Sequence, residues 1–113
     1  MVKRFDVWNI ELNPAVGHEI RKIRPCVVIS PDEANKYLKT VTIIPLTSTI
    51  KKYPTRVNCT FKGKNGQLAI DQIRAVDKVR LKKKLGVLET YTCKVFSNVS
   101  IIRSLFPNIS CFI

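Results

Sequence analysis

Short apolar segments of strand length, separated by residues that break regular structure, limit most strongly how this chain can fold. In the first segment Trp8, Ile10 and Leu12 share one face, and Phe5 and Val7 share the other. This alternation has the period of two that a strand requires, and it partly covers both faces with apolar side chains. We therefore predict a strand over residues 5–12 with apolar neighbours on both sides.

Five further segments predict strands. Residues 25–29 are continuously apolar, which is typical of a central strand buried on both faces, and Pro25 fits its first position. Residues 40–46 are rich in β-branched side chains, and Pro45 among them favours a sheet edge or a strand end. The remaining strands are predicted at residues 56–61, 67–73 and 82–87, with Asn65-Gly66 as a hairpin turn.

Helices are predicted in the connections and near the end of the chain. Ser30-Pro31-Asp32-Glu33 has the S-x-x-E pattern of a capping box, so a short helix should begin there with Ser30 as its cap and end near Tyr37. Residues 77–81 predict one helical turn. A longer helix is predicted between Glu89 and Pro107 from five apolar residues at helical spacing: Tyr91, Val95, Val99, Ile102 and Phe106. Short strands with small helices predict one domain, residues 1–113, folded as a compact barrel.

Positive charge is spread along the whole sequence. The chain has 20 Lys and Arg against 8 Asp and Glu, a formal charge of +12, and ten of the basic residues lie in residues 1–56 and ten in 57–113. A folded surface of this kind attracts polyanions, of which nucleic acid is the first candidate, an acidic protein the second and a membrane surface the third. The plain alternative is a charge that serves only solubility, although solubility needs far less asymmetry.

The cysteines give no sign of a metal or disulfide framework. Cys26, Cys59, Cys93 and Cys111 form no C-x-x-C pair, and the first two fall in apolar strand patterns where a thiol acts as a small hydrophobe. The N-terminal residues lack the apolar stretch of a signal peptide, and no run approaches the roughly 18 apolar residues of a membrane span. We therefore expect a reduced, cytoplasmic protein that uses no metal or cofactor.

Several segments resemble, in order, the MazF/PemK family of toxins. Three of them form an opening block, two lie at the end of the third strand and in the loop after it, and one follows later: residues 5–8, 12–19, 24–30, 45–48, 51–54 and 71–77. The resemblance covers residues 5 to about 89. Any one segment is a weak signal, but the ordered set with plausible spacing is a strong one.

The resemblance implies a mainly β, SH3-like small barrel of antiparallel strands, with short connecting helices and a C-terminal helix. It implies a homodimer that cleaves single-stranded RNA (mRNA) sequence-selectively and without a metal. The ribose 2′-hydroxyl would attack the adjacent phosphate, leaving a 2′,3′-cyclic phosphate and a 5′-hydroxyl. It also implies an acidic antitoxin that lies across the RNA groove, and a +12 surface suits both ligands.

The two catalytic positions implied by the resemblance are Arg24 and Thr47. The Arg24 guanidinium can grip the phosphate and stabilise its developing charge, whereas its plain alternative is an ion pair with Glu19 or Asp71. Thr47 can donate its hydroxyl to a phosphoryl oxygen, with Ser48 as its assistant. Taken without the family, these hydroxyl residues are also an ordinary polar strand end.

His18 and Glu19 are assigned auxiliary catalytic roles. His18 is the chain's one histidine, and imidazole is the side chain best suited to acid–base work at neutral pH. Some family members have serine at this position, so the histidine is not a general requirement. Glu19 can orient Arg24 or accept a proton. The alternatives are an ordinary loop histidine and a solvated loop acid.

Six residues are assigned to RNA binding: Lys51, Lys52, Tyr53, Asp71, Gln72 and Arg74. The two lysines should contact phosphates and set affinity more than sequence choice, while Tyr53 can stack on a splayed base. Asp71 lies in an otherwise apolar segment and needs a partner, so structural pairing and site organisation are both open. Gln72 and Arg74 can read a base edge or a phosphate, although Arg74 fits a dimer contact equally well.

Two other features have competing interpretations. Trp8 can stack on a base, but a core or dimer role is favoured. Residues 82–84, Lys-Lys-Lys, resemble a nucleic-acid patch, yet lysines on an edge strand also prevent aggregation, which is the interpretation we favour. Residues 20–23 are bulkier and more basic than in relatives, and residues 108–113 form an unusual apolar ending.

Three rival functions share the predicted architecture. The first is a non-catalytic RNA-binding barrel, which needs the basic surface but not the pairing of Arg24 with Thr47. The second is a protein-binding toxin of the gyrase-poison kind on the same fold. The third is a degenerate toxin that binds its antitoxin without cutting RNA. Cleavage of RNA separates all three from an endoribonuclease.

Overall fold

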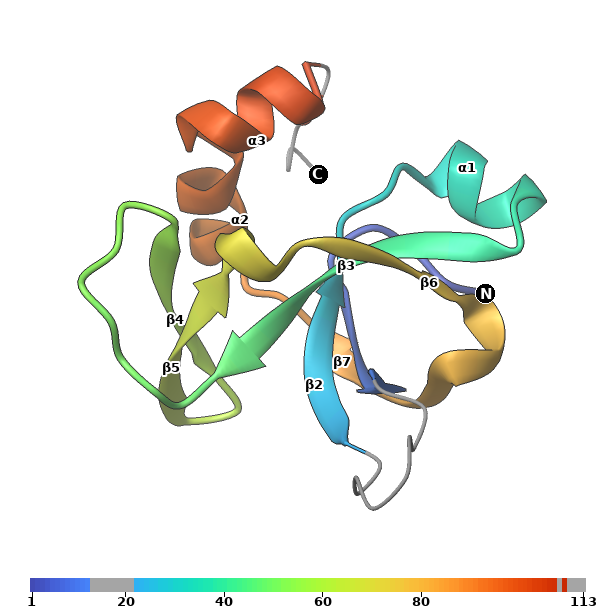
Figure 1. Cartoon of the computed structure of the whole chain (residues 1–113), viewed down its shortest axis with the longest axis horizontal. Helices are drawn as coiled ribbons and strands as arrows, with labels where there is room; N and C mark the ends of the chain where they lie inside the picture. The colour runs from blue at the N-terminus through green and yellow to red at the C-terminus, as the bar shows by residue number, and fades with distance from the viewer. Residues whose placement is uncertain (13–21, 108, 110–113) are drawn as a thin grey trace, which may run out of the picture.

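The structure, a computed structural model, describes residues 1–12, 22–107 and 109 (Figure 1). Its elements in chain order are β1 (Asp6–Glu11), β2 (Ile23–Val28), α1 (Asp32–Tyr37), β3 (Thr40–Thr47), β4 (Arg56–Phe61), β5 (Lys64–Ala69), the 3-10 turn η1 (Ile70–Gln72), β6 (Arg74–Asp77), the 3-10 turn η2 (Lys78–Arg80), β7 (Leu81–Val87), α2 (Thr90–Ser97) and α3 (Ser100–Leu105).

Strand β3 joins the two halves of the sheet. The strand order is β4-β5-β3-β2-β1-β7, and every pair is antiparallel. One edge of β3 pairs with β2, whereas its other edge pairs with β6 and then, from Leu46 onward, with β5. In Figure 1 the β4–β5 hairpin stands on one side of the molecule, and β3 runs from it to the side where β2 and β7 lie. The predicted mainly β fold with short helices is confirmed.

The prediction of one strand over residues 67–73 is wrong in its second half. β5 ends at Ala69, the turn η1 follows, and β6 begins at Arg74. The turn lets one stretch of chain serve as two successive partners of the same edge of β3. Leu68 and Ile70 are nevertheless fully buried, as predicted. Sequence patterning missed β6 because its four residues carry one buried side chain, Val76.

Pro45 lies in the middle of the sheet, so the prediction of a sheet edge or strand end is wrong. It is opposite Cys26 of β2. The bond from the Ile29 N–H to the Thr42 carbonyl sets the alternation, and it directs the backbone nitrogen of residue 45 away from β2. That nitrogen faces the interval between β6 and β5, where β3 has no paired partner. A proline therefore costs no ladder hydrogen bond here.

Two apolar clusters lie on opposite faces of the central strands. In β2 the side chain of Val27 joins one cluster, and those of Cys26 and Val28 join the other. β1 divides in the same way, with Val7 in the first cluster and Ile10 in the second. The predicted parities of the first strand and the burial of the second on both faces are confirmed. The first cluster also takes in the helices at the C-terminal end.

The hairpin turn predicted at Asn65-Gly66 lies three residues earlier, at Lys62-Gly63. Both of these residues have positive φ, 49° and 78°, as a two-residue type I′ turn requires. Asn65 and Gly66 instead pair with β4 inside β5. Gly66 is required there for closeness, because a Cβ at this position would lie 2.6 Å from the Thr47 carbonyl oxygen.

The short helix α1 ends at Tyr37 as predicted, but the capping box does not form. The helix begins after Pro31, and no side chain caps it. The Ser30 hydroxyl instead donates to the Asn35 side-chain oxygen and accepts a hydrogen bond from the Thr42 N–H at 3.1 Å. Ser30 therefore fastens the loop to β3.

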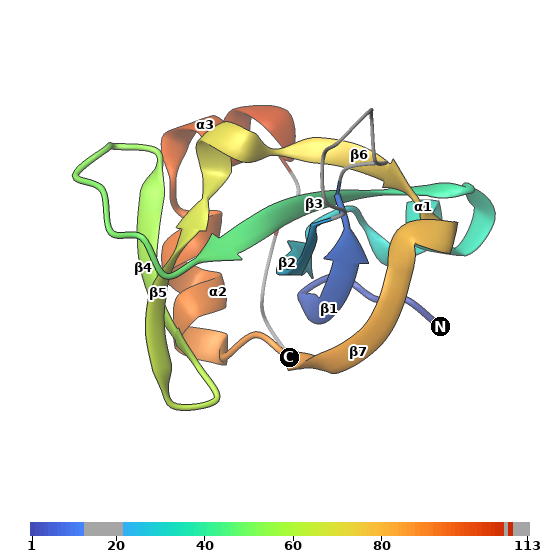
Figure 2. The same ribbon diagram turned by 60° about the horizontal axis from the view of Figure 1, so that its bottom comes forward.

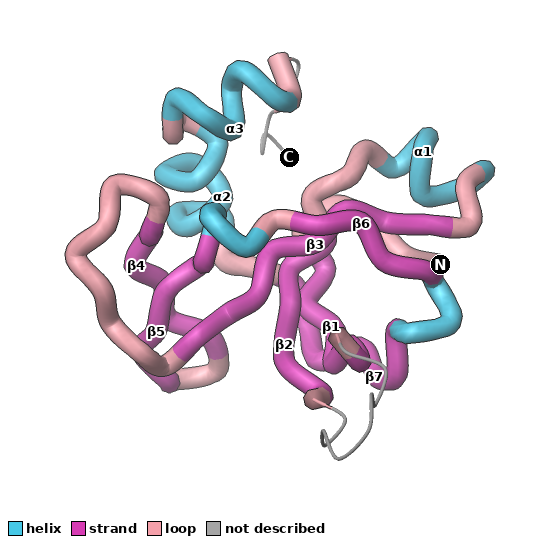
Figure 3. The backbone as a smooth tube through the Cα atoms, in the orientation of Figure 1, coloured by secondary structure: helices cyan, strands magenta, loops and turns pink. Residues whose placement is uncertain are grey.

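The single C-terminal helix predicted from the apolar stripe is two helices, α2 and α3. Val99 between them has extended backbone angles, which resets the helical phase. As a result Tyr91, expected in the core, is 76% exposed, while Phe96 and Ile102 are buried. Figures 2 and 3 show α2 and α3 beside the β4–β5 hairpin and α1 at the opposite end of the molecule.

Two smaller predictions can be compared with the structure. The helical turn predicted over residues 77–81 is η2, and the strand predicted over residues 82–87 is β7. Cys26 and Cys59 are buried, as predicted for thiols within strands, and so is Cys93. In the described part of the chain, no helix has the length and apolar character that a membrane crossing needs.

Candidate active site

A basic cleft lies where β2 and β3 meet the start of β6. Its volume is about 460 Å³. Among the residues that line it are Leu12, Lys22, Arg24, Pro45, Gln72 and Arg74. We call it the arginine cleft. It brings together three predicted site residues, Arg24, Gln72 and Arg74, although at least 48 positions in the sequence separate Arg24 from the other two.

Within residues 1–12 and 22–107, no acid forms an ion pair with the cations of the arginine cleft. Among the described residues neither Arg24 nor Arg74 forms an ion pair, so the alternative pairing of Arg24 with Asp71 is wrong. Both guanidinium groups lie close enough to Cys26 to act on its thiol, lowering its pKa, but burial outweighs them and raises it to about 12. Cys26 is thus a neutral, buried thiol near these two arginines.

Thr47 and Ser48 lie in a smaller slot of about 150 Å³. We call it the threonine slot, and it is also lined by Pro25, Cys59, Phe61, Asn65 and Gly66. Consecutive residues of β2 and β3 line the two hollows, Pro25 and Leu46 the slot and Arg24 and Pro45 the cleft, so the slot and the cleft open on opposite faces at the end of this strand pair.

The β2–β3 register relates the two predicted catalytic residues. Cys26 pairs with Pro45, and continuing this register by two residues places Thr47 opposite Arg24 on the same face of the sheet. At this point β3 leaves β2 and pairs with β5 through Leu46 and Thr47. The two side chains therefore flank the opening between diverging strands, a geometry suited to a ligand held between them.

The Thr47 hydroxyl is oriented by its own chain. Its oxygen accepts a hydrogen bond from the Thr49 N–H at 3.1 Å. Because this bond uses a lone pair, the hydroxyl proton remains available for a ligand. Ser48 is exposed next to it.

The loop after the threonine slot is held by a buried glutamine. Lys51 is gripped through its backbone: its N–H donates to Gln67 Oε1 at 3.0 Å, and its carbonyl accepts from Gln67 Nε2 at 3.2 Å. The side chains of Lys51 and Lys52 are exposed, as phosphate contacts require. Tyr53 is also exposed, and its ring faces the Arg56 guanidinium at 5.6 Å.

Asp71 has a structural partner in Arg56. The Arg56 Nε donates to Asp71 Oδ1 at 2.9 Å, and the Thr55 hydroxyl donates to the same oxygen at 3.2 Å. The hydrogen bond from Arg56 holds the pKa of the Asp71 carboxyl below its usual value. The pair ties β4 to η1, the turn that carries Gln72 into the arginine cleft.

Other predicted site residues lie outside this group. His18 and Glu19 fall outside the described residues. Trp8 packs against the second apolar cluster, and its ring nitrogen donates to Asp6 at 3.5 Å. In the lysine run, Lys84 pairs with Asp6 at 3.5 Å and Lys82 with Glu11 at 3.6 Å, which favours the edge-strand interpretation.

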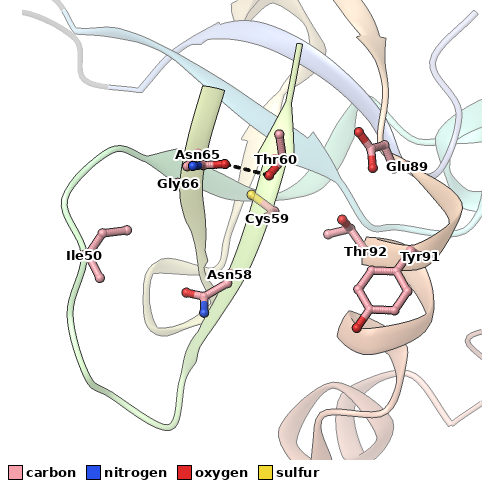
Figure 4. A pocket seen from close by; sticks show the side chains of 9 residues that line it. All are labelled: Ile50, Asn58, Cys59, Thr60, Asn65, Gly66, Glu89, Tyr91 and Thr92. Carbon is pink, nitrogen blue, oxygen red and sulfur yellow. Dashed lines mark hydrogen bonds between the residues drawn. The ribbon is translucent and has the colours of Figure 1, made fainter. Parts of the chain in front are cut away.

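Sequence reasoning missed Lys22 and a whole second cleft. Lys22 was noted only as part of a basic loop, yet it lines the arginine cleft. The second cleft, of about 450 Å³, lies between β4 and α2 (Figure 4). We call it the β4 cleft, lined among others by Asn58, Cys59, Thr60, Glu89, Tyr91 and Thr92. Its signal was hidden because the apolar stripe assigned Tyr91 to the core.

Solved structures with the same fold span nearly the whole chain. One is an endoribonuclease in complex with its cognate antitoxin from a mycobacterial species, 20% identical, with a TM-score of 0.76 over 97% of this chain and 99% of that one. A second is a MazE–MazF complex from Deinococcus radiodurans, 24% identical, with a TM-score of 0.77 over 96% and 97%. A third is the Mycobacterium tuberculosis toxin MazF-mt6, 17% identical, with a TM-score of 0.67 over 93% and 99%.

At these identities the structures establish a shared fold. The family assignment rests on the sequence: residues 3–98 match the family model described as PemK-like, MazF-like toxin of type II toxin–antitoxin system. That match covers most of the 113 residues, including the arginine cleft and the threonine slot. The chain therefore belongs to the PemK-like, MazF-like toxin family of type II toxin–antitoxin systems.

Proposed function

We propose that this protein is an endoribonuclease toxin that cleaves single-stranded RNA sequence-selectively and without a metal. The observation that carries the proposal is the arginine cleft, whose cations have no acid partner among the described residues, with Thr47 opposite Arg24 in the continued β2–β3 register. Membership of the toxin family and the fold shared with a named endoribonuclease support it.

The proposed reaction needs negative charge to be stabilised on phosphorus. The 2′-oxygen forms a bond to phosphorus, the bond from phosphorus to the 5′-oxygen breaks, and a 2′,3′-cyclic phosphate and a 5′-hydroxyl result. Arg24 donates its planar pair of N–H groups to the phosphoryl oxygens, where its charge is worth most as the phosphorane forms. Its backbone position in β2, a paired central strand, keeps this donor in place.

Thr47 supplies a neutral donor across the opening. Its hydroxyl proton points to the phosphoryl group while its oxygen stays bonded to the Thr49 N–H. Ser48 assists from the adjacent position. In this scheme His18 and Glu19 act as general base and general acid. One of them accepts the proton of the 2′-hydroxyl, and the other helps to protonate the leaving 5′-oxygen.

Binding of the strand and of the antitoxin draws on the same basic surface. Lys51, Lys52, Gln72 and Arg74 contact phosphates or base edges, and Tyr53 stacks on a base. Asp71 organises this surface through Arg56. We infer that a homodimer acts on RNA and that an acidic antitoxin neutralises it, since a neighbour of the same fold is in complex with its cognate antitoxin.

Incubation of the purified protein with varied single-stranded RNAs in excess EDTA tests the proposal. We expect cleavage, and sequencing of the 5′-hydroxyl ends should reveal both the chemistry and a recurrent target sequence. If the RNA stays intact at high protein concentration, the assignment as an enzyme is wrong. Binding without cleavage would identify a non-catalytic RNA-binding barrel or a degenerate toxin, and inhibition of a protein target without RNA binding a gyrase-poison type of toxin.

A further inference from the structure

The β4 cleft opens into the threonine slot. The two hollows share Cys59, Asn65 and Gly66 as lining residues. In Figure 4, β4 crosses the cleft, with Glu89, Tyr91 and Thr92 of the α2 end on one side of it. A chain bound at Thr47 therefore has a continuous path into the β4 cleft.

The backbone of β4 presents hydrogen-bonding groups at this cleft. β4 is the end strand of the sheet and pairs with β5 alone among the described residues. The bond from the Ile70 N–H to the Thr55 carbonyl sets the alternation of this pair. Asn58 and Thr60 consequently direct their backbone N–H and C=O away from β5. The same strand thus offers both donors and acceptors to a ligand.

Three side chains form the opposite wall of the cleft. Thr92 is only 4% exposed. Glu89 stands at the first position before α2 but does not cap the helix, and no described residue pairs with its carboxylate. Tyr91 is 76% exposed. Among the described residues, the carboxylate and the flat ring therefore face the cleft without a partner.

These groups fit a nucleobase better than a phosphate. A carboxylate repels phosphate, but it accepts hydrogen bonds from the amino and imino groups of a base. Guanine places its N1–H and N2–H donors side by side, so they match the two oxygens of one carboxylate. An exposed tyrosine ring provides a stacking platform for an unstacked base.

We propose that the β4 cleft binds a guanine base of the RNA strand near the cleaved bond, with Glu89 accepting from its Watson–Crick edge and Tyr91 stacking on it. This rests on the proposed function and adds a specificity-determining site to it. Lys64, which lines the threonine slot, supplies a cation for the phosphate on the way.

The experiment uses Glu89→Gln, Tyr91→Ala and Tyr91→Phe in the full chain. Tyr37→Ala and Glu33→Gln are matched controls, because Tyr37 is also 76% exposed and Glu33 is an exposed acid of α1. A randomised RNA is cleaved and its 5′-hydroxyl ends are sequenced. Affinity is measured in parallel on oligonucleotides with a 2′-deoxy sugar at the cleaved position, which bind but cannot be cut.

We expect the parent protein to prefer guanine at one position near the cut. Glu89→Gln should reduce that preference about tenfold, because an amide cannot accept both donors. Tyr91→Ala should weaken binding of the uncleavable RNA about 5- to 100-fold, the range of base–aromatic stacking, while Tyr91→Phe and both controls stay near the parent. Melting curves confirm that each variant folds.

An unchanged base preference in Glu89→Gln, or none for guanine in the parent, overturns the inference while RNA cleavage stands. If the parent binds RNA without cutting it, the proposed function fails, and the guanine preference of binding still decides the role of the cleft. Binding of a synthetic acidic β-strand peptide is measured for the same variants. A third outcome is that Glu89→Gln and Tyr91→Ala bind this peptide more weakly than the parent while their RNA selection is unchanged. The cleft would then take a peptide along β4, and the inference is wrong.

Discussion

The arginine cleft and the β4 cleft are almost equal in volume, about 460 and 450 Å³, but opposite in chemistry. Of the residues that the structure describes, three cations and no acid line the first cleft, whereas one acid, amides, hydroxyls and a tyrosine line the second. Cations hold phosphates, which are the same in every nucleotide, and uncharged donors and acceptors distinguish bases. The difference therefore separates a region suited to chemistry from one suited to selection.

Thr47 connects the two clefts. It lies opposite Arg24 in the continued β2–β3 register, and the threonine slot that it lines shares lining residues with the β4 cleft. The separation of roles leads to a general expectation. Changes in the arginine cleft should lower the cleavage rate on every RNA sequence, and changes in the β4 cleft should alter which sequences are cut.

The largest effect is expected from the two residues that flank the opening. Arg24→Ala removes the charged donor and should lower the cleavage rate at least about 1,000-fold on all sequences. Thr47→Ala removes one neutral donor and should cost about 100-fold. Rates on a single good substrate, measured at saturating RNA, give the comparison. Arg24→Lys keeps the charge without the planar fork, so it should fall between Arg24→Ala and the parent.

Arg103→Ala serves as the control for these variants. Arg103 is exposed on α3 and is not among the residues that line either cleft, and its removal takes away the same unit of positive charge. It should cut at close to the parental rate. Parental cleavage by Arg24→Ala or Thr47→Ala would remove that residue from the active site. A shift in base preference without a loss of rate would show that the two clefts do not divide the work as proposed.

An intermediate effect is expected from Gly66, which lines both the threonine slot and the β4 cleft. In Gly66→Ala the new Cβ would lie 2.6 Å from the Thr47 carbonyl oxygen, so the backbone of Thr47 must shift. We expect a loss of about 1–3 kcal/mol in stability from the overpacking. The cleavage rate should fall about 10- to 100-fold, because displacement of a donor by an ångström is costly.

Gly63→Ala is the matched change for Gly66→Ala. A Cβ at Gly63 meets nothing within 4 Å, but the residue has φ of +78°. Strain in this left-handed conformation should cost about 1–2 kcal/mol of stability and leave the cleavage rate unchanged. Thermal melts and rates on the same RNA test both variants. If the two glycine variants lose activity equally, the contact of Gly66 with Thr47 is not what matters.

Local patterns predicted the parts of the fold that local residues decide. Strand periodicity predicts that Trp8 and Val7 face opposite sides of β1 and that residues 25–29 are buried. The first prediction is confirmed, and the second is confirmed for residues 26–29, whereas Pro25 is half-buried. The turn was misplaced because Lys62-Gly63 and Asn65-Gly66 are both plausible turns. Only the approach of Thr47 shows why the second glycine belongs inside a strand.

The candidate site depends mainly on residues that are distant in the sequence, so local patterns did not predict how it is assembled. The proximity of Arg24 to Gln72 and Arg74 was expected only through the family resemblance. It depends on η1, which places β6 beside β3 after β5 has ended. The β4 cleft was not predicted, because the apolar spacing was interpreted as one continuous helix. The extended backbone at Val99 divides that helix, so Tyr91 does not share a face with the buried residues that follow the break. A helix break of one residue changes the spacing of the apolar residues too little to be recognised in the sequence.

The smallest effect is expected from the ion pair that links the two regions, Arg56 with Asp71. Arg56 is on β4, Asp71 is on η1 beside Gln72, and their side chains are 7% and 35% exposed. Asp71→Asn should destabilise the fold by only about 0.5–1 kcal/mol at neutral pH, because the carboxylate is largely in solvent. Asp77→Asn, another exposed acid with no ion pair among the described residues, should cost less.

The pH dependence of that small difference identifies its cause. Since Arg56 lowers the pKa of Asp71 in the folded protein, the stabilising contribution is complete above the unfolded value of about 4 and is lost as pH falls through the lower folded value. Denaturant unfolding of the parent and of Asp71→Asn between pH 7 and 2 should therefore give a constant gap down to about pH 4 that then closes. A gap that persists at pH 2 would mean that the carboxylate charge is not what ties β4 to η1, and the two clefts would then be joined by packing alone.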